Sequence, residues 1–341
     1  MLKKIATISF IFTAWITVSL LGGPIQLFSG SANHPLSEEI SDYLNLPLGE
    51  LNLGRFNDGE ASIKVNESVR NKDVFVVQST CSTDEGSVND HLMELYLLVR
   101  TLKRASVNSV TVVMPYYGYA RQDRKTSPRV PISASDVAFL LESAGTDRVV
   151  AVDLHCGQIQ GFFQKAPVDN LYASTVFVPY MAKKKLKKLV VVSPDAGGVE
   201  RAKFFQERLI REGMETDLAV IVKQRGGAGV VSRMNLVGNV MDADVVIVDD
   251  ICDTGGTLVK AAQLLKDSGA KGVYACVTHP VFSDPALARI EDSVLTEMIV
   301  MDTIPITAKL PHNVTQLSIA PLLGEAILRI NSGDSISTLF N

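Results

Sequence analysis

The segment VVIVDDICDTGGTL, residues 245–258, combines closely spaced carboxylates with glycines and hydroxyls. Its apolar start, 245–248, has the pattern of a buried strand, and Asp249 and Asp250 follow directly. The next residues supply successive backbone N–H groups, glycines free to adopt positive φ, and hydroxyl donors; they are Asp253, Thr254, Gly255, Gly256 and Thr257. Amides that open onto the N-terminus of a helix form a cradle for phosphate, so this loop predicts a phosphate site.

The paired acids Asp249 and Asp250 need a different partner, because carboxylates repel a phosphate. They suit neutral donors such as ribose hydroxyls, or the water shell of a Mg²⁺ ion. The order of strand, double acid and Gly-rich loop therefore predicts a sugar-phosphate site, with amides for the phosphate and carboxylates for the sugar. A solvated strand end with a Gly turn is the simpler explanation of an isolated DTGG.

Charged side chains also follow apolar runs elsewhere. In PYYGYARQDRK, residues 115–125, Arg121, Arg124 and Lys125 form a candidate polyphosphate clamp, because guanidinium groups match phosphate oxygens. In VDLHCGQIQGFF, residues 152–163, Asp153 and His155 would project in the same direction from a sheet edge. The simpler alternatives are a solvated basic loop and a hydrogen-bonded core histidine.

Glycine-rich turns carry three more candidates. In VVSPDAGGVERAKFF, residues 191–205, Asp195 leaves an apolar run and glycines open a helix. In IVKQRGGAGVV, residues 221–231, Lys223 and Arg225 suit a lid that brings cations to a developing charge. An ordinary strand-to-helix turn and a solvated surface loop are the alternatives.

These loops require a scaffold of alternating strands and helices. Apolar runs predict strands over 74–78, 110–114, 149–152, 189–192, 218–222, 245–248, 273–277 and 298–301. Apolar residues at spacings of three and four predict helices over 88–105, 133–143, 199–210 and 257–266. Strands without polar alternation, each followed by a helix, imply α/β architecture with mainly parallel sheets that bind ligands beyond the carboxyl ends of their strands.

Composition limits the classes of partner. The 341 residues carry a net charge of −4, which excludes a global basic field of the kind that binds nucleic acid. Cys81, Cys156, Cys252 and Cys276 are far apart in sequence, without zinc spacing, and indicate free thiols in a reducing, cytoplasmic-type compartment.

The first 23 residues are set apart from the folded chain. Lys3 and Lys4 precede an uncharged, largely apolar stretch over 5–21. It is at the short limit for a membrane-spanning helix and lacks a clear cleavage pattern. A cleaved leader for secretion or an organelle, an uncleaved membrane anchor and an upstream extension without a role in the fold all remain open, and membrane contact is expected only through this stretch.

VVIVDDICDTGGTL resembles the 5-phosphoribosyl-1-diphosphate (PRPP) fingerprint of the type I phosphoribosyltransferase fold. With the loops above and GRFNDGEASIKVNESVR, residues 54–70, the chain from about Gln26 onward resembles the ribose-phosphate pyrophosphokinase (PRPP synthetase) family. The resemblance implies two similar type I phosphoribosyltransferase-like domains, an ATP-binding one over 24–171 and a ribose-5-phosphate-binding one over 172–341. C-terminal residues are expected to pack back on the first domain.

The resemblance also implies roles for individual residues. ATP-binding residues would be Phe56, Asp58, Glu60, Arg121, Gln122 and His155, the first three of them reaching the adenine held by a neighbouring subunit. Metal-binding residues would be Asp153, His155, Asp169 and Asp195, with Mg²⁺ as the cofactor. Asp195 would also bind ribose 5-phosphate, together with Asp249, Asp250 and the loop from Asp253 to Thr257, while Lys223 and Arg225 would be catalytic. The chain departs from many members in GFFQKAPVDN, where Gln164 replaces an acid and one residue is inserted before Asp169.

The implied reaction is transfer of diphosphate from ATP to the 1-hydroxyl of ribose 5-phosphate, which gives PRPP and AMP for nucleotide biosynthesis. The family implies a homo-oligomer, commonly a hexamer. A phosphoribosyltransferase that consumes PRPP would share residues 245–258 without needing the ATP segments. A non-catalytic regulatory subunit is the other alternative, against which Lys223, Arg225, His155 and Asp249 argue.

Overall fold

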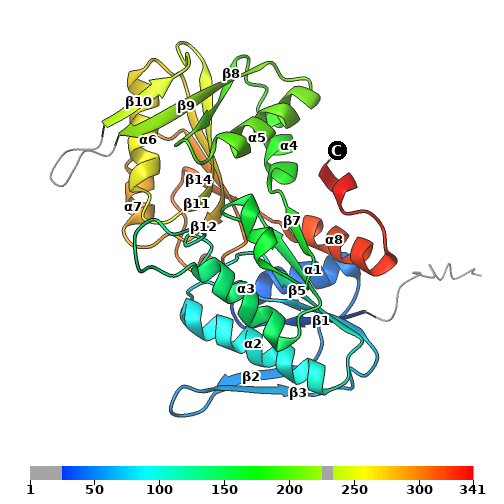
Figure 1. Cartoon of the computed structure of the whole chain (residues 1–341). Helices are drawn as coiled ribbons and strands as arrows, with labels where there is room; N and C mark the ends of the chain where they lie inside the picture. The colour runs from blue at the N-terminus through cyan, green and yellow to red at the C-terminus, as the bar shows by residue number, and fades with distance from the viewer. Residues whose placement is uncertain (1–24, 225–232, 341) are drawn as a thin grey trace, which may run out of the picture.

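Two sheets organise the chain in a computed structural model that describes residues 25–224 and 233–340 (Figure 1). The first sheet is parallel throughout, in the order β1-β4-β5-β6-β7. Its strands are β1 (Ile25–Ser29), β4 (Asp73–Val77), β5 (Ser109–Met114), β6 (Arg148–Val152) and β7 (Val168–Leu171). Its helices are α1 (His34–Leu44), α2 (Val88–Arg104) and α3 (Ser133–Ala144), with a 3₁₀ turn η1 (Gly157–Phe162) after β6.

The second sheet has the order β10-β9-β8-β11-β12-β13-β14 and is parallel except for β10, which runs antiparallel to β9. Its strands are β8 (Leu189–Ser193), β9 (Thr216–Gln224), β10 (Arg233–Val237), β11 (Asp244–Cys252), β12 (Val273–Pro280), β13 (Glu297–Met301) and β14 (Val314–Leu317). Its helices are α4 (Ser174–Lys183), α5 (Val199–Arg211), α6 (Gly256–Asp267) and α7 (Ala286–Glu291). The predicted α/β class with mainly parallel sheets is confirmed.

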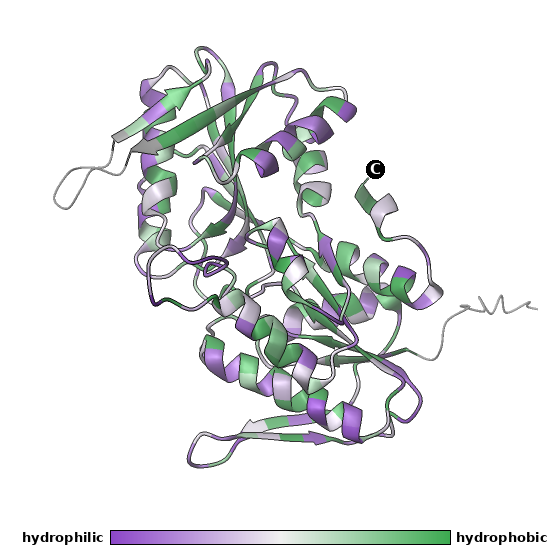
Figure 2. Ribbon diagram, in the orientation of Figure 1, coloured by the Kyte–Doolittle hydropathy of each residue, from purple (hydrophilic) through white to green (hydrophobic). Residues whose placement is uncertain are grey.

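Alternating side chains of each buried strand enter different cores. In β4, Val76 packs with α2 and α3, whereas Val77 joins a cluster that continues through α1, α4, α5, β8 and β11. Figure 2 shows hydrophobic residues gathered along the strands and hydrophilic residues on the outward helix faces. Both faces of each sheet are covered, which is why the strands read as continuous apolar runs in the sequence.

All the predicted strands and helices are present, and the structure adds further elements that were not predicted. The hairpin of β2 (Leu51–Arg55) and β3 (Ala61–Val65) was not predicted, because most of its side chains are exposed or only partly buried. The edge strands β1, β7, β10 and β14 were also missed, as were the helices α1, α4 and α7 and the C-terminal helix Ala320–Ser332. β11 extends four residues beyond the predicted 245–248, so Asp249 and Asp250 lie within a strand instead of after one.

The carboxyl ends of the two sheets face each other. Thr278 of β12 donates to Asp153 Oδ2 after β6, at 2.6 Å, and His279 Nε2 lies 3.0 Å from the carbonyl oxygen of Val152. Ser79, after β4, donates to the carbonyl oxygen of Thr303 at 2.6 Å. Ligand sites of parallel sheets form beyond these ends, so both sheets contribute to the same region.

The chain returns to its beginning through α8 (Ala320–Ser332), which is followed by η2 (Ser337–Phe340). Leu323 and Ile327 of α8 and Leu36 and Ile40 of α1 are buried in one cluster (Figure 1). Ser318 also donates to Glu39 Oε2 at 2.5 Å. A helix that follows the second sheet thus completes the core of the first.

A buried carboxyl near this junction predicts a pH effect on stability. Burial raises the pKa of Asp302 from 3.8 to about 6, while its Oδ1 accepts a hydrogen bond from Ile319 N at 2.8 Å. The folded chain keeps this proton where the unfolded chain has lost it, so stability falls as pH rises from about 4 to about 6. Asp302→Asn keeps the acceptor without the charge, and we expect it to raise the free energy of unfolding by about 1–3 kcal/mol at pH 8 and by much less at pH 5.

Urea denaturation at both pH values measures this difference, with exposed Asp292→Asn as the control. An equal change at pH 5 and pH 8 would contradict the assignment of the effect to the Asp302 charge.

No helix in the described ranges is long and apolar enough to cross a membrane. The prediction for residues 5–21 lies outside those ranges.

Candidate active site

Asp250 of β11 joins the two halves of the candidate site. Its side chain is only 5% exposed, and both of its oxygens have protein partners. Oδ2 lies 2.6 Å from His155 Nδ1 of the first domain, and Oδ1 lies 3.1 Å from Arg201 Nη1 of α5. Burial would raise the pKa of Asp250, but Arg201 and His155 together lower it. Asp250 is therefore an ionised carboxylate whose two oxygens have partners within the protein, and its role at the ribose, directly or through a hydrated Mg²⁺, stays a prediction.

Asp249 is the more accessible acid of the pair, with 25% of its side chain exposed. Its Oδ1 accepts from Asp250 N at 3.0 Å and lies 3.7 Å from Arg201 Nη1. Burial, and then the charge of Asp250, raise the pKa of Asp249. Among the described residues no hydrogen bond occupies Asp249 Oδ2, so this oxygen is the one available to a ligand.

The predicted phosphate loop lies between β11 and α6. Gly255 has φ +72° and precedes Gly256, the first residue of α6, so of the two glycines free to adopt positive φ only Gly255 does. Arg289 Nη1 donates to the carbonyl oxygen of Thr254 at 3.0 Å and fixes the start of the loop. The amides of the loop thus open onto a helix N-terminus, as the sequence predicted.

The first domain contributes a cation to this loop. Arg121 Nη1 lies 2.6 Å from Asp253 Oδ2, although 132 residues separate the two in sequence. Gln122, the residue after Arg121, accepts a hydrogen bond from the Ser133 hydroxyl at 2.5 Å. Arg121, from the predicted ATP segment, therefore meets the predicted ribose-phosphate loop directly.

His155 faces the second sheet and keeps one nitrogen for a ligand. Its Nδ1 donates to Asp250, and this hydrogen bond raises the pKa of His155. A carboxylate on Nδ1 fixes the tautomer and orientation of a ligand-binding histidine, which leaves Nε2 to face the ligand. No hydrogen bond to Nε2 is formed by the described residues.

Two predicted metal ligands are held elsewhere. Asp153 is 7% exposed, and its Oδ2 accepts from Thr278 and from Ala173 N, at 2.6 and 3.1 Å. Asp169 lies within β7 opposite Val150 and pairs with Arg148 at 2.5 Å, away from the carboxyl end of the sheet. Both acids have structural partners among the described residues, and their roles as metal ligands stay predictions.

Asp195 occupies the expected position after β8. Its Oδ1 accepts from Gly197 N and Gly198 N, at 3.0 and 3.1 Å, and its charge contributes to the raised pKa of Asp249. Lys223 lies within β9, where its backbone pairs with Met234, and not on a loop as predicted. Arg225 lies outside the described residues.

The hairpin residues Phe56, Asp58 and Glu60 are not brought to the site. Phe56 is 59% exposed, and the β2–β3 hairpin projects from the end of the first domain remote from the second sheet (Figure 1). An exposed aromatic beside exposed acids is suited to contact another molecule, and the role across a subunit boundary stays a prediction.

Sequence reasoning missed several groups at the centre of the site. Arg201 contacts both acids of β11, and Asp123 Oδ2 accepts from Cys156 and Gln158, at 3.0 and 2.8 Å. His279 lies edge-on to Tyr116, with ring centroids 5.0 Å apart, and burial lowers its pKa to about 4. Their partners come from segments distant in sequence, so no local pattern marks them.

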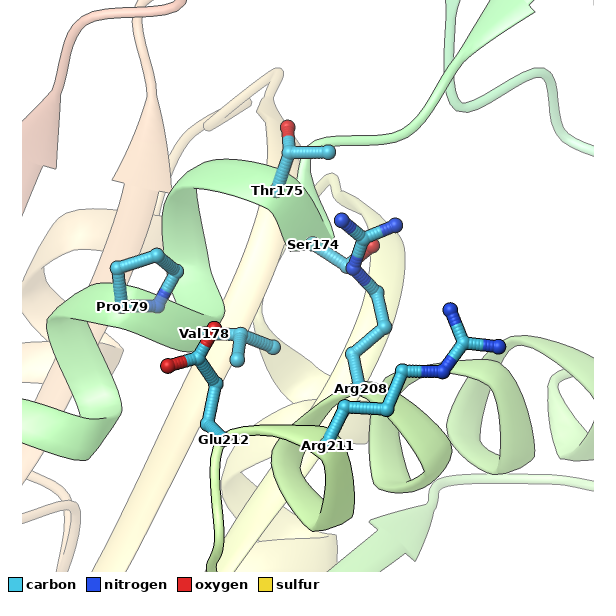
Figure 3. Close-up of a pocket in the computed structure, with 7 residues that line it drawn as sticks. All are labelled: Ser174, Thr175, Val178, Pro179, Arg208, Arg211 and Glu212. Atoms are coloured by element: carbon cyan, nitrogen blue, oxygen red, sulfur yellow. The ribbon is translucent and has the colours of Figure 1, made fainter. Parts of the chain in front are cut away.

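A separate cavity of about 120 Å³ lies between α4 and α5, lined by Ser174, Thr175, Val178, Pro179, Arg208, Arg211 and Glu212 (Figure 3). Arg208 is about 10 Å along α5 from Arg201. Arg208 and Arg211 both approach the carbonyl oxygen of Phe340, at 3.1 and 3.5 Å. This cavity is not part of the site formed by β11, α6 and His155.

Comparison with known proteins agrees with this geometry. Residues 25–145 match the model of the N-terminal domain of ribose phosphate pyrophosphokinase, and residues 227–341 match that of the phosphoribosyl synthetase-associated domain. Ribose-phosphate pyrophosphokinase of Campylobacter jejuni is 49% identical over 315 residues, which cover 92% of this chain and 98% of the relative. The chain belongs to the ribose-phosphate pyrophosphokinase family.

Two further relatives support the assignment. The Ralstonia nicotianae pyrophosphokinase is 50% identical over 319 residues, 93% of this chain and 98% of the relative. The crystal structure of phosphoribosylpyrophosphate synthetase from Mycobacterium smegmatis superposes with a TM-score of 0.82 at 39% identity, covering 90% of this chain and 98% of that one. The match extends over both sheets, so the pyrophosphokinase architecture applies to the whole described chain.

The donor groups of this pyrophosphokinase fit a hydrated metal ion better than an enclosed one. Within 25–224 and 233–340, no three His, Cys, Asp or Glu side chains converge closely enough to hold a metal by themselves. Mg²⁺ is commonly bound by one or two carboxylates, waters and substrate phosphates. Asp195 and Asp249 supply such carboxylates at one sheet edge, so the residues present fit Mg²⁺ that arrives with a phosphate ligand.

Proposed function

We propose that this pyrophosphokinase transfers the diphosphate of ATP to the 1-hydroxyl of ribose 5-phosphate and releases PRPP and AMP. The observation that carries the proposal is that residues predicted to bind ATP contact residues predicted to bind ribose 5-phosphate. Arg121 reaches Asp253, and His155 reaches Asp250, each at 2.6 Å. A nucleotide on the first domain and a sugar phosphate on the second would therefore lie next to each other.

The phosphate loop and Asp249 would hold ribose 5-phosphate. The amides of the loop bind its phosphate, at the N-terminus of α6, where the helix dipole favours negative charge. Asp249 Oδ2 accepts from the sugar hydroxyls, directly or through water. The sugar separates the carboxylate from the phosphate, so the two do not compete for one group.

The reaction then requires the 1-oxygen to approach the β-phosphorus of ATP in line. A bond forms between these atoms, the bond from the β-phosphorus to the bridging oxygen breaks, and AMP leaves with that electron pair while the hydroxyl proton is released. Arg121 and Gln122 would orient the phosphates, and Lys223 with Arg225 would stabilise the charge that develops on AMP. Mg²⁺, held through Asp195, Asp249 and the Nε2 side of His155, would neutralise phosphate oxygens.

Mixing the protein with ATP, Mg²⁺ and ribose 5-phosphate tests the proposal, with AMP and PRPP measured as products. Absence of AMP would leave a PRPP-consuming transferase or a regulatory subunit as the explanation. We expect Lys223→Ala to lower kcat by about 10²–10³-fold, because it removes a transition-state charge contact. A variant with the wild-type rate would exclude Lys223 from catalysis.

We also propose that the enzyme is a homo-oligomer in which the β2–β3 hairpin of one subunit reaches the nucleotide of another. The exposure of Phe56, Asp58 and Glu60 supports this arrangement. Mixing Phe56→Ala subunits with Arg121→Ala subunits would restore part of the activity if the residues act across a subunit boundary.

The free thiols of Cys81, Cys156, Cys252 and Cys276 support a reducing compartment for the catalytic domains. Residues 5–21 are proposed as the only segment that contacts a membrane, as a leader or an anchor. N-terminal sequencing of the native protein distinguishes a removed leader from a retained one.

A further inference from the structure

Arg201 lies where three distant segments meet. It is on the first turn of α5, and its Nη1 is 3.1 Å from Asp250 Oδ1 and 3.7 Å from Asp249 Oδ1. Its Nη2 donates to the backbone carbonyl oxygen of His155 at 3.3 Å. One guanidinium therefore contacts the acids of β11 and the loop after β6 at the same time.

The helix beneath Arg201 gives this contact a rigid base. Ala202, Phe205 and Leu209 of α5 are buried in the cluster that includes Val191 of β8 and Val246 of β11. With one face of the helix fixed on the sheet, the position from which the guanidinium extends is fixed as well. The planar guanidinium then offers Nη1 and Nη2 to different partners, which a lysine ammonium cannot reproduce with the same geometry.

Charge gives a second reason for an arginine here. Asp249 and Asp250 are adjacent in sequence, and Asp153 and Asp195 also lie close enough to act on Arg201 electrostatically. Carboxylates gathered this closely repel one another unless a cation lies among them. Arg201 supplies that cation, and it is paired mainly with Asp250, the acid that orients His155.

We propose that Arg201 is a positioning residue for diphosphate transfer: it holds Asp250 against His155 across the two domains and leaves Asp249 as the acid that faces the sugar. The expected effect of Arg201 on the reaction rate rests on the proposed function. The contacts of Arg201 with Asp250 and with the carbonyl oxygen of His155 are properties of the folded chain and can be tested without substrates.

Kinetics of Arg201→Met and Arg201→Lys measure the consequence. We expect the methionine variant to lower kcat about 100-fold, because a displaced His155 and Asp250 misalign the reacting groups. The KM for ribose 5-phosphate should change less than about threefold, since the phosphate loop is untouched and Arg201 contacts Oδ1 of Asp249, not the Oδ2 that faces the ligand. Lysine, which keeps the charge but not the fork, should lose about tenfold. Lys203→Met, on an exposed position of the same helix, is the matched control and should keep the wild-type rate.

A double-mutant cycle with Asp250→Asn separates positioning from direct contact with substrate. If Arg201 acts through Asp250, the double variant should be at least tenfold more active than the product of the single losses predicts. Multiplicative losses would overturn the proposal, because Arg201 would then act on the substrate independently. So would a methionine variant with unchanged kcat.

Hydrogen exchange in the absence of substrates supplies a readout that does not depend on activity. Arg201→Met should speed exchange over residues 153–163 and leave α2 unchanged. If the wild type makes no AMP, the proposed function fails, but the exchange measurement still shows whether Arg201 holds the loop after β6 in place. If AMP is made but exchange over 153–163 is the same in the variant, the Arg201 proposal fails alone. Should the methionine variant not fold, as judged by circular dichroism, the lysine variant gives the same comparison.

Discussion

Asp249→Asn is expected to lower kcat/KM for ribose 5-phosphate by about 10²–10³-fold. Asp249 Oδ2 is the carboxylate oxygen of the β11 pair that the described residues leave to a ligand, whereas Asp250 is used by Arg201 and His155. An amide cannot supply the same charge to a hydrated Mg²⁺ or to a polarised hydroxyl, and the loss of one such contact commonly costs about 3–4 kcal/mol in the transition state. Steady-state rates of AMP formation at varied ribose 5-phosphate measure the change.

Asp242→Asn is the matched control for this experiment. Asp242 precedes β11, is exposed and has φ +55°, a conformation that asparagine tolerates well. It should keep wild-type kinetics. An Asp249→Asn enzyme within about threefold of the wild type would show that the carboxylate facing the sugar comes from another residue.

Gly255→Val is expected to raise the KM for ribose 5-phosphate by about 100-fold and to change the KM for ATP far less. Gly255 has φ +72°, and a β-branched residue there is strained by about 1–3 kcal/mol. The loop relieves that strain by shifting, and the shift turns its amides away from the phosphate. Because the amides act as a group, the loss of binding should exceed the strain energy itself.

Gly213→Val separates backbone strain from ligand binding. Gly213 has φ +82° at the end of α5, and a Cβ added there would meet nothing within 4 Å. The two variants should lose similar stability in thermal unfolding, but only the change at Gly255 should alter the KM for ribose 5-phosphate. Equal rises in KM for both substrates at Gly255 would indicate general damage instead of a phosphate site.

The sequence predicted those parts of the site that depend on local order. The segment 245–258 contains the strand, acid and loop in succession, and the structure places them as β11, Asp249 and the N-terminus of α6. The apolar runs of buried parallel strands were equally clear. Local patterns sufficed because each element is formed by neighbours in the chain.

Contacts between segments distant in sequence could not be predicted in this way. Asp249 and Asp250 are identical in type and adjacent, yet only the fold shows that Asp250 turns to His155, 95 residues away in sequence. Arg201 appeared as one more charge on an amphipathic helix. The resemblance implied metal-binding roles for Asp153 and Asp169, and only the fold shows that Thr278 and Arg148 are their partners.

The packing of α8 on α1 bears on how the protein is made. The core beneath α1 contains Leu323 and Ile327, which the ribosome adds only after both sheets have been synthesised. Until then the first domain exposes the apolar surface of α1 that α8 later covers, and nascent chains with such surfaces are prone to aggregation and bind chaperones. The core of the first domain is therefore complete only once α8 has been synthesised, so the folding of the two domains is linked before any substrate binds.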